Sequence, residues 1–266
     1  MLRNPFLKSL RDHLRPLLVW GAGAALYVAL LMSIYPSIRN SAAAINEYVK
    51  EMPEAIRAAF MGSSDFTTPV GYVNVELLSW LAPVVLIAFA VVLAARSLAG
   101  EEESGTLSLV LTHAVGRRRL VLHKYAALIV AVAALGGVFW ASLMIATAIA
   151  GTPVGSGELG VAFLRLTLLG LAMGSITFAV GGGTGRRQYG IAAGAGVAVA
   201  MYLLNTLAVM DESVRPFRYV SLFHYAGGAA PLGKDLDVAG LAVMAATSAV
   251  MLVAALVLFE RRDVHV

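Results

Sequence analysis

Cysteine is absent from the 266 residues, and charged residues make up only 14% of them. Without cysteine, neither a disulfide framework nor a thiolate metal site can form. A soluble domain of this length carries roughly 25% charged residues. This chain is instead 59% hydrophobic, with a mean hydropathy of +0.79. Lipid is therefore the predicted solvent for most of the chain.

The sequence also lacks a motif that could hydrolyse a nucleotide. Residues 228–235 (GAAPLGKD) match P-loop spacing up to Lys234, but Asp235 then replaces the hydroxyl residue that binds magnesium. The glycine-rich residues 180–190 are better explained as a tight turn than as a phosphate site. The five histidines form no His-Glu-x-x-His pattern, so no zinc enzyme is indicated.

Long apolar runs recur along the chain. A bilayer core about 30 Å thick requires about 20 consecutive apolar residues for a helical crossing. Barrel strands of alternating hydrophobicity do not occur. The sequence predicts an all-α polytopic membrane protein with one transmembrane domain over residues 1–266. Its six predicted spans are residues 17–35, 77–99, 125–150, 159–180, 189–210 and 238–259.

Lysine and arginine are distributed unequally between the two sides that these spans define. Six crossings place both termini on one side, and thirteen of the 20 basic residues fall on that side. Because basic loops stay in the cytoplasm, we expect cytoplasmic termini and a location in the plasma (inner) membrane. The net charge of +4 then reflects topology, and no nucleic-acid partner is needed to explain it.

Two segments beside the spans are amphipathic. Residues 4–15 place apolar side chains on one helical face and basic ones on the other, which predicts an interfacial helix along the inner leaflet. Its apolar residues are Phe6, Leu7, Leu10 and Leu14. On the outer side, the patterns over residues 42–52 and 53–60 predict two short helices.

Charge is concentrated between the second and third spans, in GEEESGTLSLVLTHAVGRRRLVLHKY (residues 100–125). Three glutamates, residues 101–103, lie where a short helix is expected to begin, the end at which negative charge is favourable. Leu107 and Leu111 share one face of this helix, and three arginines, residues 117–119, follow it. Such an element is suited to dock into a groove on a soluble partner. The alternative is that its charges only anchor the flanking spans.

This stretch closely resembles the cytoplasmic loop of ABC-2 type transporter permeases. In that family an acid-rich turn is followed by Gly-Thr-Leu, further leucines, a Ser or Thr, and an Arg-containing start of the third helix. Residues 218–232 (RYVSLFHYAGGAAPL) and 259–264 (FERRDV) are also similar to the family, although Leu222 stands where a proline is common. The family's loop is a coupling helix that contacts the nucleotide-binding subunit, and the amphipathic N-terminal helix supports it.

The resemblance implies a permease that exports cargo with energy from a separate ABC ATPase chain. ATP and Mg²⁺ would bind to that ATPase, and no cofactor or metal is expected in this chain. A second permease copy or a paralogue is implied, because six helices are half of a typical ABC transmembrane unit. The implied connecting helix contains Phe6, Leu7, Leu10, Arg11 and Leu14. The implied ATPase contact consists of Glu101, Glu102, Glu103, Gly105, Thr106, Leu107, Leu111, Arg117, Arg118 and Arg119.

An ion-coupled secondary transporter is the main alternative, followed by a membrane scaffold or an intramembrane enzyme. Ion-driven carriers usually hold carboxylates at mid-membrane. Here Glu76 only borders the second predicted span, and Arg96 and Arg165 lie near span ends, where they can reach the interface. A spanning region without buried charge favours a hydrophobic or amphipathic cargo, such as a drug, antibiotic or lipid. Candidate residues for the substrate path are Trp140, Met144, Met173, Tyr202 and Asn205.

Overall fold

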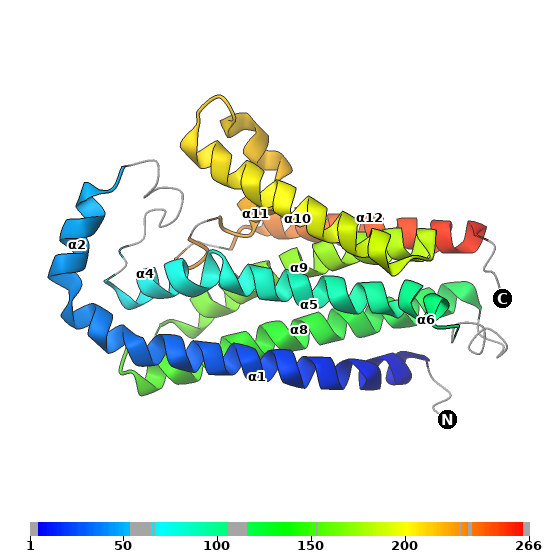
Figure 1. Ribbon diagram of the computed structural model, residues 1–266, viewed down its shortest axis with the longest axis horizontal. Coiled ribbons are helices and arrows are strands. Elements are labelled where there is room, and N and C mark those ends of the chain that lie inside the picture. Colours follow the sequence, from blue (N-terminus) through cyan, green and yellow to red (C-terminus); the bar gives the residue numbers. More distant parts are fainter. Residues whose placement is uncertain are drawn as a thin grey trace.

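The protein is a bundle of long helices (Figure 1). In the computed structural model, the described part of the chain folds into helices and turns without a strand. Six of the helices are long and apolar enough to cross a membrane, which confirms the predicted all-α polytopic fold. The described residues are 5–53, 65, 67–105, 116–152, 154–228, 230–233 and 236–262.

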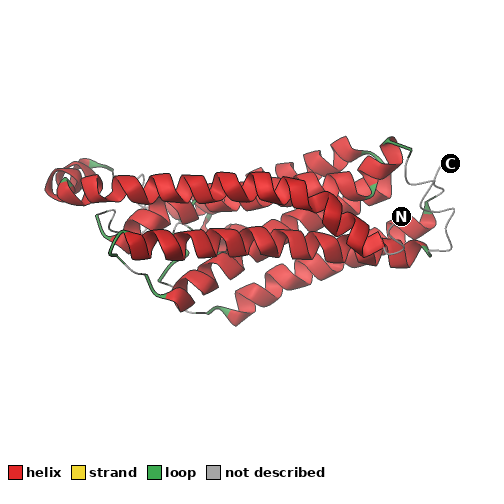
Figure 2. Ribbon diagram, turned by 90° about the horizontal axis from the view of Figure 1, so that it is seen from below, coloured by secondary structure: helices red, strands yellow, loops and turns green. Residues whose placement is uncertain are grey.

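The long helices run side by side along the long axis in both views (Figures 1 and 2). Both termini lie at one end, as an even number of crossings requires (Figure 1). The crossing helices are α1 (Pro5–Asn40), α4 to α5 (Pro69–Ser97), α8 (Arg117–Ile149), α9 (Ser156–Thr184), α10 (Arg187–Met210) and α12 (Val238–Arg261). The shorter helices are α2 (Ala42–Glu51), α6 (Ala99–Glu103), the 3₁₀ helix η2 (Arg215–Val220) and α11 (Leu222–Tyr225).

The N-terminal amphipathic segment differs from the expectation of a separate interfacial helix. It forms the first turns of α1, which continues through Pro16 into the first span. Ser9 and His13 are buried, so one face of this segment packs against protein. Leu7 and Leu14 are exposed, at 47% and 48%, as the amphipathic pattern predicts. Packing along α8 overrides the tendency of an internal proline to end the helix.

On the opposite side, α2 matches the first of the two expected outer helices. Residues 54–60, where most of the second was predicted, lie outside the described part of the chain.

The second span is a composite of three segments. It begins as α4 (Pro69–Val73), continues as one π-helical turn, η1 (Asn74–Leu78), and resumes after Trp80 as α5 (Leu81–Ser97). Asn74 is buried, and its side-chain amide pairs with the backbone of Leu232, donating to the carbonyl at 3.3 Å and accepting from the N–H at 2.9 Å. These two hydrogen bonds tie the beginning of the second span to the segment that precedes α12.

The centre of the bundle is formed by α9 and α5. In the most apolar window of α9, 67% of the residues are buried, against 17% for α10 and for α12. Close approach depends on glycine: a Cβ added at Gly174 would lie 3.0 Å from Cβ of Ala90, and one at Gly170 would lie 3.1 Å from the carbonyl oxygen of Leu86. Small residues therefore let α5 and α9 meet backbone to backbone.

Helix α10 packs on α9 through a second pair of glycines. A Cβ added at Gly190 would lie 2.8 Å from the carbonyl oxygen of Thr177, and one at Gly194 would overlap Oγ1 of the same threonine. Gly196, on the same helix, faces open space, with nothing within 4 Å of an added Cβ. The Gly-x-x-x-Gly spacing of residues 190 and 194 thus marks a real helix contact.

These two environments give a matched test. We expect Gly194→Leu to lower the free energy of unfolding by roughly 1–3 kcal/mol, because the added side chain forces α10 away from Thr177. Gly196→Leu, two residues further along the same helix, serves as the control and should leave stability unchanged. Thermal unfolding of both purified variants in detergent measures the difference, and equal midpoints would show that the α9–α10 contact is not close.

Candidate coupling site

The predicted charged stretch begins with a short helix, α6, directly after the second span. Glu101, Glu102 and Glu103 all lie in α6, and we call these three side chains the acidic hub. The helix ends at a turn in which Gly105 has φ of +70° and donates its N–H to the carbonyl of Glu102 at 2.9 Å. Thr106, Leu107 and Leu111, in which the docking helix was predicted, lie outside the described residues.

Glu101 joins α6 to two neighbouring helices. Its carboxylate lies 2.8 Å from Nζ of Lys124 on α8 and 3.5 Å from Nζ of Lys8 on α1. Lys124 is only 3% exposed, and its ammonium group also donates to the carbonyl of Ser97 at 3.0 Å. Burying an ammonium group is costly unless it is paired and hydrogen-bonded, so Glu101 compensates a charge that α8 carries into the bundle.

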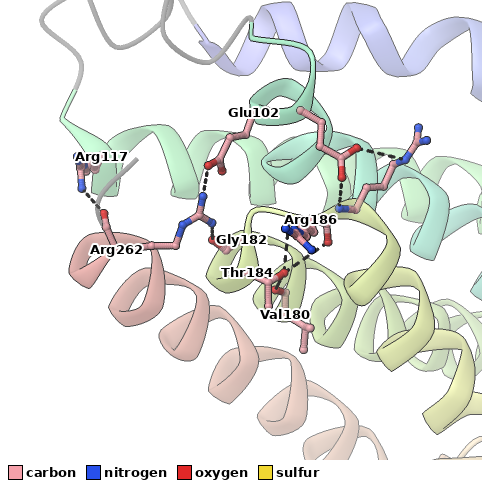
Figure 3. Close-up of polar contacts among 9 residues, drawn as sticks. Glu102, Arg117, Val180, Gly182, Thr184, Arg186 and Arg262 are labelled. Atoms are coloured by element: carbon pink, nitrogen blue, oxygen red, sulfur yellow. Dashed lines mark hydrogen bonds and ion pairs between the residues drawn. The ribbon is translucent and has the colours of Figure 1, made fainter. Parts of the chain in front are cut away.

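Glu102 reaches the end of α12, where it pairs with Arg262 (Figure 3). The same guanidinium donates to the carbonyl of Gly182 at the end of α9, at 3.1 Å. The backbone carbonyl of Arg262 in turn accepts from Arg117, the first residue of α8, at 2.9 Å. Gly185, with φ of +68°, leaves room for this guanidinium, because any side chain there would collide with it. One arginine thus joins α6, α8 and α9 to the end of α12.

Glu103 contacts the start of α10. Its carboxylate accepts the backbone N–H of Arg187 at 2.8 Å and lies 3.9 Å from the Nε atom of that residue. Because the first N–H groups of a helix have no partner within it and carry partial positive charge, this carboxylate caps α10 from a neighbouring helix. The turn between α9 and α10 is held by Thr184, whose hydroxyl donates to Val180 at 2.8 Å and accepts from Arg186 (Figure 3).

The predicted arginine triplet divides into different environments. Arg117 donates to the backbone carbonyl of Arg262, the residue that pairs with Glu102 of the acidic hub. Arg118 pairs with Glu260 on the exposed surface, with 75% of the arginine side chain accessible, so solvent screens this pair. Arg119 is exposed.

The structure therefore places the predicted glutamates in an intramolecular network. Sequence reasoning did not assign their partners, which are Lys8, Lys124, Arg187 and Arg262. One signal was available in the sequence, because a lysine about two turns into α8, next to an apolar run, needs a compensating carboxylate. The docking role predicted for Thr106, Leu107 and Leu111 remains a prediction.

The candidate path residues lie on three helices. Trp140 of α8 is 38% exposed and donates to the carbonyl of Ser156, Met144 packs partly buried on the same helix, and Met173 of α9 is fully buried. Tyr202 of α10 packs edge-on against Phe223, with 5.4 Å between ring centroids. Asn205, near the end of α10, lines a cavity.

Two expectations about charge in the membrane are corrected. Arg165 does not extend to the surface of the bundle, because its side chain, in the third turn of α9, is only 2% exposed. Glu76 does not border the second span but lies within it, half-buried in η1. Arg96 is exposed near the end of α5, as expected. The spanning region therefore contains buried charge. Among the described residues, no group of three or more His, Asp or Glu could hold a metal ion.

Six apolar crossings define the class, a multi-pass membrane protein, and a set of ion pairs joins several of these helices near α6. Residues 4–264 match the sequence profile of the ABC-2 family transporter protein, and the chain belongs to this family. It is thus an ABC transporter permease, as the loop after the second span indicated. A comparison with curated proteins finds no match.

The buried ion pair gives a second test. We expect Glu101→Gln to lower the free energy of unfolding by about 3 kcal/mol, because it leaves the Lys124 ammonium group buried without a carboxylate. Combining it with Lys124→Met should recover part of the loss, since the double variant buries no charge. Denaturant or thermal unfolding in detergent measures both.

Glu260→Gln is the control, because it removes a carboxylate at the same end of the bundle from an exposed pair. It should leave stability unchanged. A double variant as unstable as the sum of its single variants would show that Glu101 and Lys124 do not interact.

Proposed function

We propose that this permease belongs to an ATP-driven exporter and is energised by a separate ATPase subunit. ATP and Mg²⁺ bind to that subunit, since this sequence contains no complete P-loop. The termini and the acidic hub face the cytoplasm of an inner (plasma) membrane, as the excess of Lys and Arg at this end favours. The ATPase docks on the segment that begins at Thr106, between α6 and α8, through the predicted apolar stripe of Leu107 and Leu111.

The observation that supports this mechanism most is the set of contacts made by the acidic hub. Glu101 contacts α1 and α8, Glu102 contacts the end of α12, and Glu103 contacts the start of α10. Only Ser104 and Gly105 separate α6 from the docking segment. When the ATPase displaces that segment, it therefore moves α6, which is tied to several crossing helices at once. As these helices shift, the transport path opens to alternate sides of the membrane.

A second permease copy, identical or paralogous, completes the exporter. Helices α10 and α12 bury only 17% of their apolar windows within one chain, so most of their surface faces lipid or another protein. Large residues such as Leu203 and Val250 are exposed there, at 52% and 60%. Two copies enclose the transport path between them, since six helices are half of a typical ABC transmembrane unit.

The cargo that we propose is an amphipathic small molecule, such as a drug, an antibiotic or a lipid. A purely hydrophobic cargo was expected on the ground that the spanning region contains no buried charge, and the structure removes this ground. Arg165 is buried within α9, and Glu76 lies half-buried in η1. A cargo with both apolar and polar parts is compatible with a bundle of this composition.

Docking and transmission can be tested separately. We expect Leu107→Asp with Leu111→Asp to abolish co-purification of the partner ATPase subunit, because charge on the predicted apolar stripe prevents docking in a groove. We expect Glu103→Ala to retain co-purification but to reduce transport at least tenfold, because α10 is no longer capped by α6. Pull-down and transport in proteoliposomes measure the two effects.

The control is Glu260→Ala, which removes an exposed carboxylate at the same end of the bundle and should change neither property. Full ATPase binding and transport by the Leu107 and Leu111 double variant would overturn the docking assignment. Full transport by Glu103→Ala would overturn the role of the acidic hub.

A further inference from the structure

A polar cavity lies beyond the end of α10. Its volume is about 460 Å³, and it is enclosed by the last turns of α10, by η2 and by the turn that follows α11. This region is at the end of the bundle away from both termini (Figure 1). We call it the outer cavity. Its polar lining includes Asn205, Glu212, Arg215, Arg218 and His224.

Positive charge exceeds negative charge in the outer cavity. Two guanidinium groups, of Arg215 and Arg218, face one carboxylate, that of Glu212. Neither arginine forms an ion pair within the part of the chain that the structure describes. The nearby carboxylate of Asp211 is already engaged as an acceptor for the N–H of Ser213, at 2.8 Å. An anion entering the cavity therefore meets two arginines that have no ion-pair partner among the described residues.

Arg218 is held in place while most of its donors are unused. Its Nη2 donates to the hydroxyl of Tyr219 at 2.8 Å, and its guanidinium carbon lies 4.8 Å from the centroid of that ring. The backbone carbonyl of Tyr219 accepts from the hydroxyl of Tyr225 at 2.9 Å, which fixes η2 against α11. A guanidinium has five N–H donors, so a pre-positioned Arg218 retains the capacity to bind an oxyanion.

The surroundings of the cavity indicate an amphipathic ligand. Ala208, Val209 and Met210 contribute an apolar wall beside the arginines. On η2, Phe217 and Tyr219 are 58% and 54% exposed, and tyrosine is enriched where a protein meets the lipid head groups. The cavity thus combines polar lining residues with an apolar wall, and exposed aromatic side chains lie on the neighbouring η2.

We propose that the outer cavity binds the anionic head group, a phosphate or a carboxylate, of an amphipathic molecule at the outer membrane interface. The planar fork of Arg218 pairs with two oxygens of such a group, and Arg215 adds the second positive charge. The amide of Asn205 supplies a further donor from the end of α10. Placement on the outer face rests on the proposed orientation, whereas the ligand chemistry does not depend on ATP-driven export.

The test uses the purified full chain in an uncharged maltoside detergent, without any ATPase. Dodecyl phosphate is added, and its apparent affinity is obtained from the rise in the thermal unfolding midpoint. We expect Arg218→Gln and Arg215→Gln each to weaken this affinity roughly tenfold or more, the effect of losing a charged hydrogen bond. Arg215 is exposed, so its variant reports on binding even where Arg218→Gln disturbs η2.

The matched control is Arg39→Gln, which removes an exposed arginine at the same end of the bundle, on α1. It should bind dodecyl phosphate like the unmodified chain. A neutral dodecyl polyethylene glycol ether tests the need for charge, and inorganic phosphate tests whether a free anion suffices. Stabilisation by inorganic phosphate that Arg215→Gln abolishes would support the site and identify a free anion as its occupant. Equal affinity in all variants, or equal stabilisation by the neutral ether, would overturn the proposal.

Discussion

A lysine ammonium group shielded from water requires a carboxylate, and this requirement fixes the position of α6. Lys124 enters the bundle on α8, and Glu101 meets it at 2.8 Å. Consecutive residues of a helix point about 100° apart, so placing Glu101 directs Glu102 and Glu103 toward other neighbours. The three glutamates consequently contact helices that are far apart in sequence, and Glu102 and Arg262 are 160 positions apart. The charged end of the bundle is organised around this one buried pair.

The crossing helices could be predicted because lipid imposes a length and a composition that are visible in the sequence. Their ends could not, since hydropathy detects only the apolar part of a helix. The third crossing begins at Arg117 rather than at residue 125, because charged residues continue the helix beyond the apolar run. In α1, the helix likewise continues through Pro16, where packing on α8 outweighs the local preference for a break. The family was recognisable because its signature lies in one contiguous loop.

The partners of the acidic hub could not be predicted from the sequence. They come from four helices, and a basic residue at a helix end looks the same whether it faces lipid head groups or a carboxylate. Arg165 shows the same limit, because its sequence position allows either an interfacial or a buried side chain, and only the neighbours of α9 decide. The outer cavity joins Asn205 to η2 and the turn after α11, segments whose proximity depends on how the chain returns toward α12.

The π-helical turn in the second span has a mechanical consequence. The first residue of this turn, Asn74, is tied to Leu232, and on the other side of the turn α5 leads into α6 and its glutamates. Trp80, with φ of −141°, interrupts regular helical geometry between the two parts. Such an interruption allows the two parts of a helix to bend or rotate relative to each other. The half of this crossing that leads into α6 can consequently reorient while the half that Asn74 ties to Leu232 stays in place, so the two ends of one crossing helix are mechanically separate.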